Sequence, residues 1–571
     1  MIDEQRYEIK MERDVVAKMR DGVILRADVF RPVVAGRFPV ILQRTPYNKA
    51  NYNANGAPFA IRAAAQGYVV ILQDVRGRFA SDGDWYPFQH EVDDGYDTVE
   101  WAADLPYSNG KVGMFGWSYL GVTQMSAALA QPPHLVSLFP VVTACDYYDE
   151  WTYRGGAFQQ FFNESWASFR LAPDTLDRRV KKSASAMNRV WELPLGNFSF
   201  FETGSVRDLA PYFFHWLEHP AYDDYWKQWS LNGRFGKIGV PCYHVGGWYD
   251  IFLNGTLRNY MGVKAMGGSE AARNGQRLTI GPWYHDSVSF REGKAGEVSF
   301  APAGCVNEED EMLRWFDHTL KGVSSGLAEK PVRIFVMGEN VWRDEEDWPL
   351  ARARATRFHL HSGGRANSLA GDGSLREAEP HAESPDRFLY DPANPVRTQG
   401  GGNCCDHDHL APGVFDQRPV ENRADVLVYS TLPLDSDVEV SGPVSVELFV
   451  SSSAVDTDFT AKLVDVHPNG SAFNLADGIL RMRFRNSFEK AEPMAPGEAY
   501  KITIDLWATS NLFRKGHRIR LEISSSNFPR YDRNLNTGED LLTGKHMLPA
   551  HQTVYHDRVR PSALILPIVP R

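Results

Sequence analysis

A serine in a glycine-flanked turn is the residue best placed to do chemistry in this 571-residue sequence. The segment 116–121, Gly-Trp-Ser-Tyr-Leu-Gly, follows an apolar run and precedes small residues. A serine on a sharp strand-to-helix turn exposes its Oγ, and the helix N-terminus offers free N–H groups to a developing oxyanion. Ser118 is therefore a candidate nucleophile. The second glycine stands one residue later than in the generic G-x-S-x-G pattern, so a serine that only caps a helix remains an alternative.

A nucleophilic serine needs a base and a carboxylate that orients the base, and two later segments supply them. Asp250 ends the segment Gly-Gly-Trp-Tyr-Asp after an apolar run, and His285 ends Gly-Pro-Trp-Tyr-His after another. Both positions correspond to the carboxyl ends of strands, where α/β sheets place functional side chains. Asp250 could instead only cap a helix. Asp286 is a competing carboxylate, but as a sequence neighbour of His285 it is the poorer partner for that ring.

Alternating strand and helix patterns between residues 23 and 145 predict a mainly parallel sheet. The apolar runs 38–43 and 68–74 are typical of strands covered on both faces, with a crossover helix over 57–65 between them. The runs 111–118 and 135–142 predict two more strands, joined by a helix over 121–130. A further helix is expected to bury one apolar stripe, formed by Val92, Tyr96, Val99 and Ala103.

Tryptophan- and phenylalanine-rich stretches with helical spacing predict a helical insertion over 147–235. Because such insertions overlie the carboxyl ends of the strands, Trp151, Phe158 and Trp166 are expected to line an apolar substrate pocket. Strand patterns resume at 239–245 and 277–280. Asn307 is expected to cap a helix that ends near Gly322.

Beyond residue 330 the apolar residues alternate with a period of two, which predicts an all-β domain, most simply a sandwich. The alternation is clearest at 332–336, 444–450, 500–506 and 519–523, and the segment 361–425 is expected to form long surface loops. The predicted organisation is an α/β core over 1–146 and 236–328, the helical insertion over 147–235, and the β domain over 329–571.

The composition excludes several classes of protein. With 43% hydrophobic and 23% charged residues the chain is globular, and its net charge of −11 argues against binding to nucleic acid or anionic membranes. No run of about 18 apolar residues and no leader pattern occurs, so we expect a soluble, cytoplasmic protein. The five cysteines form no zinc pattern. His407-Asp408-His409 beside Cys404-Cys405 is a weak candidate for a metal site, and no metal or cofactor is expected.

The ordered series of motifs resembles the cocaine esterase-like (CocE/NonD) hydrolases over nearly the whole chain. These enzymes are related to X-Pro dipeptidyl-peptidases and α-amino acid ester hydrolases. Six segments match. Three are the segments already described around Ser118, Asp250 and His285. The others are Arg-Thr-Pro-Tyr-Asn-Lys at 44–49, Asp-Val-Arg-Gly-Arg at 74–78 and Asp-Pro-Ala-Asn-Pro-Val at 391–396. The family pattern is G-x-S-Y-x-G, so it accounts for the displaced glycine.

The resemblance implies an α/β-hydrolase core, a helical cap and a C-terminal jelly roll. It also implies that Ser118, Asp250 and His285 form a catalytic triad, with the Tyr47 hydroxyl and the Tyr119 backbone N–H as the oxyanion hole. Without it, Tyr47 would be interpreted as a turn aromatic after a proline. Arg76 and Arg78 are expected to anchor loops rather than to contact substrate.

The sequence thus predicts a serine hydrolase that cleaves small esters with an aromatic or apolar acyl group through an acyl-enzyme. Amide hydrolysis, by an acylase or a dipeptidyl-peptidase, is the nearest alternative. Amino acid ester hydrolases place carboxylates after the triad aspartate, whereas apolar residues follow Asp250 here, so an uncharged acyl group is favoured. A remote alternative is a non-catalytic carbohydrate-binding protein. The sequence determines neither the natural substrate nor the oligomeric state, and it is compatible with a homo-oligomer.

Overall fold

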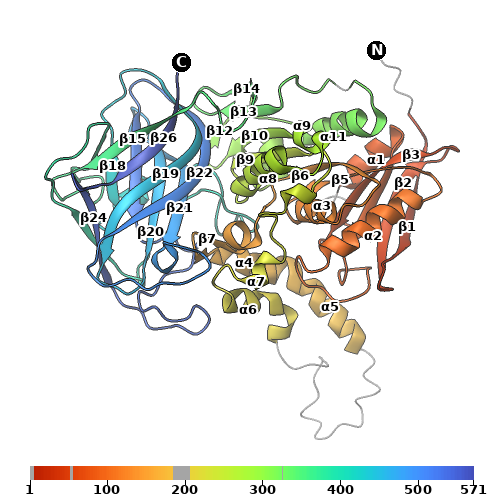
Figure 1. Cartoon of the computed structure of the whole chain (residues 1–571), viewed down its shortest axis with the longest axis horizontal. Helices are drawn as coiled ribbons and strands as arrows, with labels where there is room; N and C mark the ends of the chain where they lie inside the picture. Colours follow the sequence, from red (N-terminus) through yellow and green to blue (C-terminus); the bar gives the residue numbers. More distant parts are fainter. Residues whose placement is uncertain (1–5, 52–55, 184–205, 325) are drawn as a thin grey trace, which may run out of the picture.

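The computed structural model describes residues 6–51, 56–183, 206–324 and 326–571. An α/β core and a β-rich domain lie side by side, with a group of short helices against both (Figure 1). No helix among the described residues is both long enough and apolar enough to cross a membrane.

The core is built on a mixed, mainly parallel sheet. From edge to edge its strands are β1 (Ile9–Lys18), β2 (Ile24–Pro32), β4 (Val69–Asp74), β3 (Phe38–Thr45), β5 (Ser108–Trp117), β6 (Leu135–Val141), β9 (Tyr243–Tyr249), β10 (Arg277–Tyr284), β13 (Val332–Val336) and β14 (Val341–Glu345). The strands from β4 to β13 run parallel, whereas β1, β2 and β14 are antiparallel to their neighbours. Every residue of β4 is buried, as the continuous apolar run predicts for a strand covered on both faces.

Helices cover both faces of this sheet. They are α1 (Ala57–Ala65), α2 (Glu91–Asp104), α3 (Tyr119–Leu129), α8 (Leu253–Met266), α9 (Glu270–Asn274), α10 (Ser287–Glu292), α11 (Glu308–Phe316) and the π-helical turn η7 (Asp317–Lys321). Helix α1 has the predicted bounds, and Asn307 caps α11 by accepting from the Glu309 N–H at 3.2 Å. A small hairpin of β11 (Lys294–Ala295) and β12 (Val298–Ser299) lies between α10 and α11 in the chain.

The predicted apolar stripe of α2 is wrong. The buried residues of this helix are Glu91, Asp94, Gly95, Thr98, Val99 and Ala102, whereas Val92, Tyr96 and Ala103 are only half-buried. The buried carboxylates have cationic partners on other elements: Glu91 binds Arg44, and Asp94 binds Arg76. Charge pairing therefore allows this helix to bury a largely polar face.

The helical insertion follows β6 and carries mostly short elements. These are η1 (Tyr147–Thr152), β7 (Tyr153–Arg154), β8 (Ala157–Phe158), α4 (Gln160–Ser165), η2 (Trp166–Leu171), α5 (Ala172–Ser183), η5 (Val206–Leu209), α6 (Pro211–Glu218), α7 (Asp224–Lys227) and η6 (Phe235–Lys237). Part of the predicted insertion, 184–205, lies outside the described residues. The large aromatic side chains of the described part of the insertion pack together as a buried cluster.

The C-terminal part of the chain forms the β-rich domain. Its elements are β15 (Arg354–His361), β16 (Ser374–Arg376), β17 (Asp386–Tyr390), α12 (Arg418–Glu421), β18 (Leu427–Ser430), β19 (Val438–Ser452), β20 (Asp458–Val466), β21 (Ala472–Arg481), η8 (Met482–Phe484), β22 (Tyr500–Phe513), β23 (Arg518–Ser524), β24 (Ala550–Asp557), β25 (Arg560–Pro561) and β26 (Ala563–Val569). The alternating residues of β19, β22 and β23 point into its core as predicted.

Two expectations for this region need correction. The alternation at 332–336 belongs to β13, which pairs with β10 and extends the sheet of the α/β core. A period of two identifies a strand but not the sheet that it joins. The segment 361–425 is not only surface loop: it contains β16, β17 and α12, and residues 400–404 are buried.

A buried arginine fastens the insertion to the β-rich domain. The Arg154 guanidinium, on β7, donates to Asp477 Oδ1 at 3.0 Å and to the Tyr531 hydroxyl at 2.9 Å. It also lies 3.6 Å from the centre of the Trp507 ring. Both members of the ion pair are largely buried, so their separation would leave an uncompensated charge.

Candidate active site

Ser118 occupies a strained turn between β5 and α3. Its φ of 57° and ψ of −120° are rare for a residue with a side chain, and its side chain does not cap the helix. Its carbonyl accepts from the Gly121 N–H at 2.8 Å and from the Thr143 hydroxyl at 2.9 Å. The helix-capping alternative is therefore wrong, and the geometry is that of a nucleophile elbow.

The two glycines of the motif are required by close packing. A Cβ on Gly121 would lie 2.5 Å from the Cβ of Thr143, and a Cβ on Gly116 would lie 2.5 Å from that of Leu120. The glycine at position 121 thus lets α3 approach the segment after β6. This contact gives a physical reason for the spacing Gly-x-Ser-x-x-Gly.

Asp250 and His285 lie in contact at the ends of neighbouring strands. Asp250 follows β9, His285 follows β10, and Asp250 Oδ2 is 2.6 Å from His285 Nδ1. The other carboxylate oxygen accepts from the Phe252 N–H at 2.6 Å, and the Phe252 ring packs edge-on to the imidazole. Asp286 instead caps α10 by accepting from the Val288 N–H at 2.8 Å, so it does not orient the histidine.

The three residues share one edge of the sheet. Strands β5, β6, β9 and β10 are consecutive and parallel, so the turns after them emerge at the same end. Ser118 follows β5, two strands from the strand that precedes Asp250. Their placement agrees with the predicted Ser, Asp, His order along the sheet.

Tyr47 lies over this edge after β3. Trp166 Nε1–H donates to its phenol oxygen at 3.0 Å. Burial raises the pKa of Tyr47 to about 12, while hydrogen bonds with Trp166 and with Ser118 act in the opposite direction. The phenol is therefore protonated at neutral pH and adjoins the serine.

Arg78 holds the segment that carries Tyr47. Its Nε donates to the Pro46 carbonyl at 2.9 Å, and its Nη1 donates to the Leu171 carbonyl of the insertion at 2.8 Å. Arg76 binds Asp94 and Asp21. Both arginines anchor loops, as predicted from the sequence.

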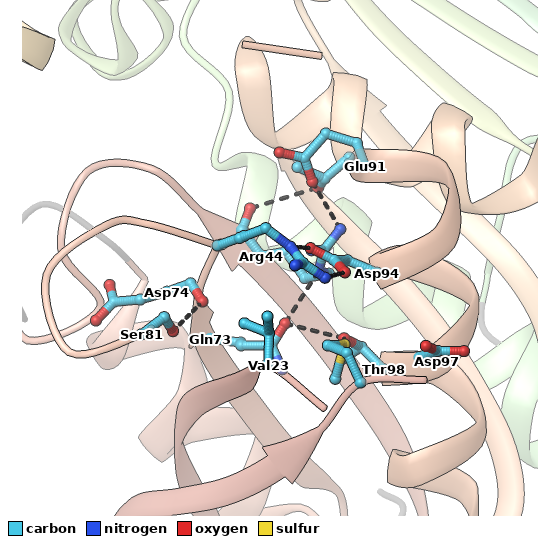
Figure 2. Close-up of polar contacts among 12 residues, drawn as sticks. Val23, Arg44, Gln73, Asp74, Ser81, Glu91, Asp94, Asp97 and Thr98 are labelled. Carbon is cyan, nitrogen blue, oxygen red and sulfur yellow. Dashed lines mark hydrogen bonds and ion pairs between the residues drawn. The ribbon is translucent and has the colours of Figure 1, made fainter. Parts of the chain in front are cut away.

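A buried series of hydrogen-bonded polar side chains next to the Ser118 turn was missed by sequence reasoning. Tyr119, the first residue of α3, donates through its hydroxyl to Glu91 Oε1 at 3.1 Å and accepts from the Phe88 N–H at 2.7 Å. Arg44 Nη1 donates to the other Glu91 oxygen at 2.7 Å, and its Nε donates to Gln73 (Figure 2). Burial raises the pKa of Glu91, and the charge of Arg44 opposes that rise. Arg44 and Tyr119 lie in the segments 44–49 and 116–121 that the sequence singled out, but no sequence pattern indicated that both side chains bind Glu91.

The predicted pocket residues divide into two groups. Trp151 and Trp166 are buried in an aromatic cluster that also contains Tyr119, Tyr147, Phe162, Trp216 and Phe252. Trp151 stacks on Phe252, with ring centres 4.4 Å apart. Phe158 belongs to the same cluster but lines a cavity of about 310 Å³ toward the β-rich domain, and neither tryptophan is among the described residues that line it.

The loop that contains Cys404 and Cys405 packs against Asp250. A Cβ on Gly402 would lie 3.2 Å from the Asp250 carbonyl oxygen. Cys404 joins the aromatic cluster and forms a disulfide with Cys405. The sequence predicted neither this bond nor the position of the loop, because an irregular segment gives no periodic signal for its packing partner.

Comparisons with known proteins agree with this architecture. Family models of the X-Pro dipeptidyl-peptidase (S15 family) and of the X-Pro dipeptidyl-peptidase C-terminal non-catalytic domain match residues 21–287 and 326–565. Cocaine esterase from Rhodococcus sp. (strain MB1 Bresler) is 38% identical, over 98% of this chain and 98% of its own length. A putative serine esterase of Mycobacterium bovis is 25% identical over 96% of this chain and 94% of its own.

Solved structures support the same assignment. An α-amino acid ester hydrolase matches with a TM-score of 0.80 and 25% identity, over 100% of this chain and 98% of its own. A CocE/NonD family hydrolase from Staphylococcus aureus, 21% identical, has the same fold with a TM-score of 0.71 over 98% of this chain and 94% of its own. These relatives are enzymes, which rejects the binding-only alternative. The chain belongs to the cocaine esterase-like (CocE/NonD) family and is a serine hydrolase with an α/β-hydrolase core and a C-terminal β-rich domain.

Proposed function

We propose that this enzyme hydrolyses carboxylic esters with Ser118 as nucleophile, His285 as general base and Asp250 as the carboxylate that orients the base. The observation that carries the proposal is the 2.6 Å contact between His285 Nδ1 and Asp250 Oδ2, at the sheet edge where the Ser118 turn emerges. Because this bond uses Nδ1, the other ring nitrogen, Nε2, is the atom that exchanges a proton with the serine.

The reaction then proceeds in two steps. Ser118 Oγ attacks the ester carbonyl while His285 Nε2 takes the hydroxyl proton, and the same nitrogen returns it to the leaving alcohol as the acyl-enzyme forms. Water repeats the sequence to release the acid. Asp250 accepts the hydrogen bond of the Nδ1–H group and stabilises the imidazolium.

The oxyanion of each tetrahedral intermediate binds to two donors in this proposal. One is the Tyr47 hydroxyl, which is protonated because burial raises its pKa to about 12. The other is the backbone N–H of Tyr119, which lies in the first turn of α3 and has no acceptor within the helix. A donor of this kind typically lowers the barrier by about 2.7–4 kcal/mol.

The surroundings of the triad favour an uncharged aromatic or apolar acyl group. The three residues that follow Asp250, which are Ile251, Phe252 and Leu253, are apolar and buried. Phe252 lies between His285 and Trp151 and contacts both rings. A substrate ammonium would find no carboxylate among these three residues to bind it. The insertion over 147–235 would act as the cap of this pocket.

The experiment combines a serine-directed probe with a panel of substrates. Wild-type enzyme, Ser118→Ala and the control Ser168→Ala are treated with a fluorophosphonate and analysed by intact mass. Turnover is then measured on aryl esters of aromatic, aliphatic and α-amino acids, and on the matching amides. Ser168 lies in the insertion, and its exposed hydroxyl donates to the Glu164 carbonyl at 2.6 Å.

We expect one label on wild type and on the control, and none on Ser118→Ala. Ester turnover should fall at least about 10⁴-fold in Ser118→Ala. Wild-type turnover of aromatic or aliphatic esters should exceed that of α-amino acyl esters and amides. Near-normal turnover by Ser118→Ala contradicts the nucleophile assignment. A preference for α-amino acyl esters contradicts only the assigned acyl class.

A further inference from the structure

We infer a binding site for a divalent transition-metal ion in the β-rich domain, formed by Asp465, His467 and His517. Each residue offers one ligand atom, and the three atoms all lie within 4.8 Å of one another. This cluster is distinct from the weak candidate for a metal site that the sequence offers at 407–409. The inference does not depend on the proposed esterase mechanism.

Sheet geometry explains why three residues distant in sequence meet. Strands β20 and β23 are antiparallel neighbours, and Asp465 pairs with Ile519 while Val466 pairs with Arg518. Continuing this register places His467 opposite His517. Residues two apart in a strand share a face, so all three side chains lie on the same face of the sheet.

The three side chains lie close to the positions that binding of one metal ion requires. His517 Nδ1 is 2.8 Å from Asp465 Oδ1, and His467 Nε2 is 3.9 Å from Asp465 Oδ2. The two imidazole centres are 4.3 Å apart. Asn511 donates from Nδ2 to Asp465 Oδ2 at 3.3 Å. Such an outer hydrogen bond orients a ligating carboxylate and tunes its affinity for the metal.

The surrounding backbone fixes two of the ligands. The turn that carries His467 is closed by its N–H, which donates to the Ser471 carbonyl at 2.8 Å. His517 stands directly before β23, and its N–H donates to the Arg514 carbonyl at 2.9 Å. Asp465 is 6% exposed, His517 13% and His467 38%, so solvent reaches one side of the cluster.

The donor set selects the class of ion. Two imidazole nitrogens and one carboxylate suit Zn²⁺, Co²⁺, Ni²⁺ or Cu²⁺, whereas Ca²⁺ and Mg²⁺ require oxygen ligands. With three protein ligands, water on the exposed side completes the coordination. The ion would link the β20–β21 turn to the start of β23 and so stabilise the folded state by mass action.

The test measures zinc binding by the full chain. Chelator-stripped enzyme is dialysed against Zn²⁺, and bound zinc is counted; Co²⁺ replaces Zn²⁺ for visible spectroscopy. We expect one equivalent of zinc, cobalt d–d absorption, and a higher thermal midpoint with zinc than without it. His467→Ala and His517→Ala should each weaken zinc binding by more than the ~10–100-fold that loss of an outer partner causes.

The control variant is His551→Ala, which removes an exposed histidine of β24 and should bind zinc like the wild type. If an alanine variant fails to fold, as judged by circular dichroism, His467→Gln in the exposed turn replaces it. Absence of stoichiometric zinc binding by the wild type overturns the inference. So does zinc binding that persists unchanged in the His467→Ala/His517→Ala double variant.

Discussion

The indole N–H of Trp166 donates a hydrogen bond to the phenol oxygen of Tyr47 at 3.0 Å. Tyr47 belongs to the α/β core and Trp166 to the helical insertion, so this bond joins the two parts at the proposed oxyanion hole. Tyr47 also forms a hydrogen bond with Ser118, so its hydroxyl connects the insertion to the turn that carries the serine.

Tyr47→Phe should therefore lower kcat by ~10²-fold or more while changing KM less, since the lost donor acts on the transition state. Steady-state kinetics on an activated aryl ester measures both constants. A defect confined to KM would mean that Tyr47 only positions substrate.

Trp166→Phe should reduce kcat by a smaller factor, because Tyr47 keeps its hydroxyl but loses the bond that orients it. The matched control is Trp216→Phe, since the Trp216 ring stacks on Trp166, with ring centres 5.9 Å apart. Equal losses of kcat in the two variants would show that aromatic packing, rather than the hydrogen bond to Tyr47, is responsible.

Glu91→Gln should destabilise the α/β core by up to about 3 kcal/mol, because it removes the charge that lies 2.7 Å from the buried Arg44 guanidinium and leaves only the more distant Asp94 carboxylate, at 4.0 Å. The control on the same helix is Asp93→Asn, whose carboxylate is exposed and whose ion pair contributes about 0–1 kcal/mol. The thermal midpoint of each variant is compared with that of the wild type. A wild-type midpoint for Glu91→Gln would contradict the role assigned to this pair.

A histidine and an aspartate in the β-rich domain should make stability depend on pH. Burial pushes the pKa of His556 down, but the hydrogen bond to Asp386 at 2.8 Å and the charges of Asp386 and Glu383 together outweigh burial and raise the pKa above the ordinary 6.5. Burial pushes the pKa of Asp386 up, but hydrogen bonds from His556 and three other groups hold it below 3.8.

The contribution of His556 to the stability of the folded state is thus complete below pH 6.5 and is lost as the pH rises through its raised pKa. That of Asp386 is complete above pH 3.8 and is lost as the pH falls through its lowered pKa. We expect the difference in thermal midpoint between wild type and His556→Gln to be largest between these values and to shrink toward pH 9. The exposed His381→Gln should show no such trend. A difference that does not vary with pH contradicts the pairing.

The Cys404–Cys405 disulfide predicts a specific thiol count. Protein denatured without reductant should show three free thiols, from Cys145, Cys242 and Cys305, and five after reduction. Intact mass should rise by two hydrogen atoms on reduction. Five thiols before reduction would contradict the bond. Disulfides are rare in reducing compartments, so this count also bears on the predicted cytoplasmic location.

The core and the turn at Ser118 were predictable because their signals are local. Apolar runs such as 68–74 identify buried strands, and a glycine-flanked serine between a strand and a helix identifies the elbow. The contact between Asp250 and His285 was expected from their positions after two strands and from the family resemblance. Parallel neighbours bring the residues after their carboxyl ends to one edge.

The remaining features depend on partners that a periodic pattern does not identify. The polar face of α2 is buried because Arg44 and Arg76, from other elements, reach Glu91 and Asp94. Strand β13 joins the core sheet because β10 offers a parallel edge. The loop that contains Cys404 has no periodic pattern of apolar residues, and its contact with Asp250 arises only from the tertiary structure.

The ion pair between Arg154 and Asp477 limits how substrate enters. A rigid outward swing of the insertion would separate the Arg154 guanidinium from the Asp477 carboxylate, from the Tyr531 hydroxyl and from the Trp507 ring. We expect substrate entry and product release to rely on local motion of side chains and loops, while β7 remains packed against the β-rich domain. The insertion would then stay fixed over the reacting groups and would not open and close as a hinged lid.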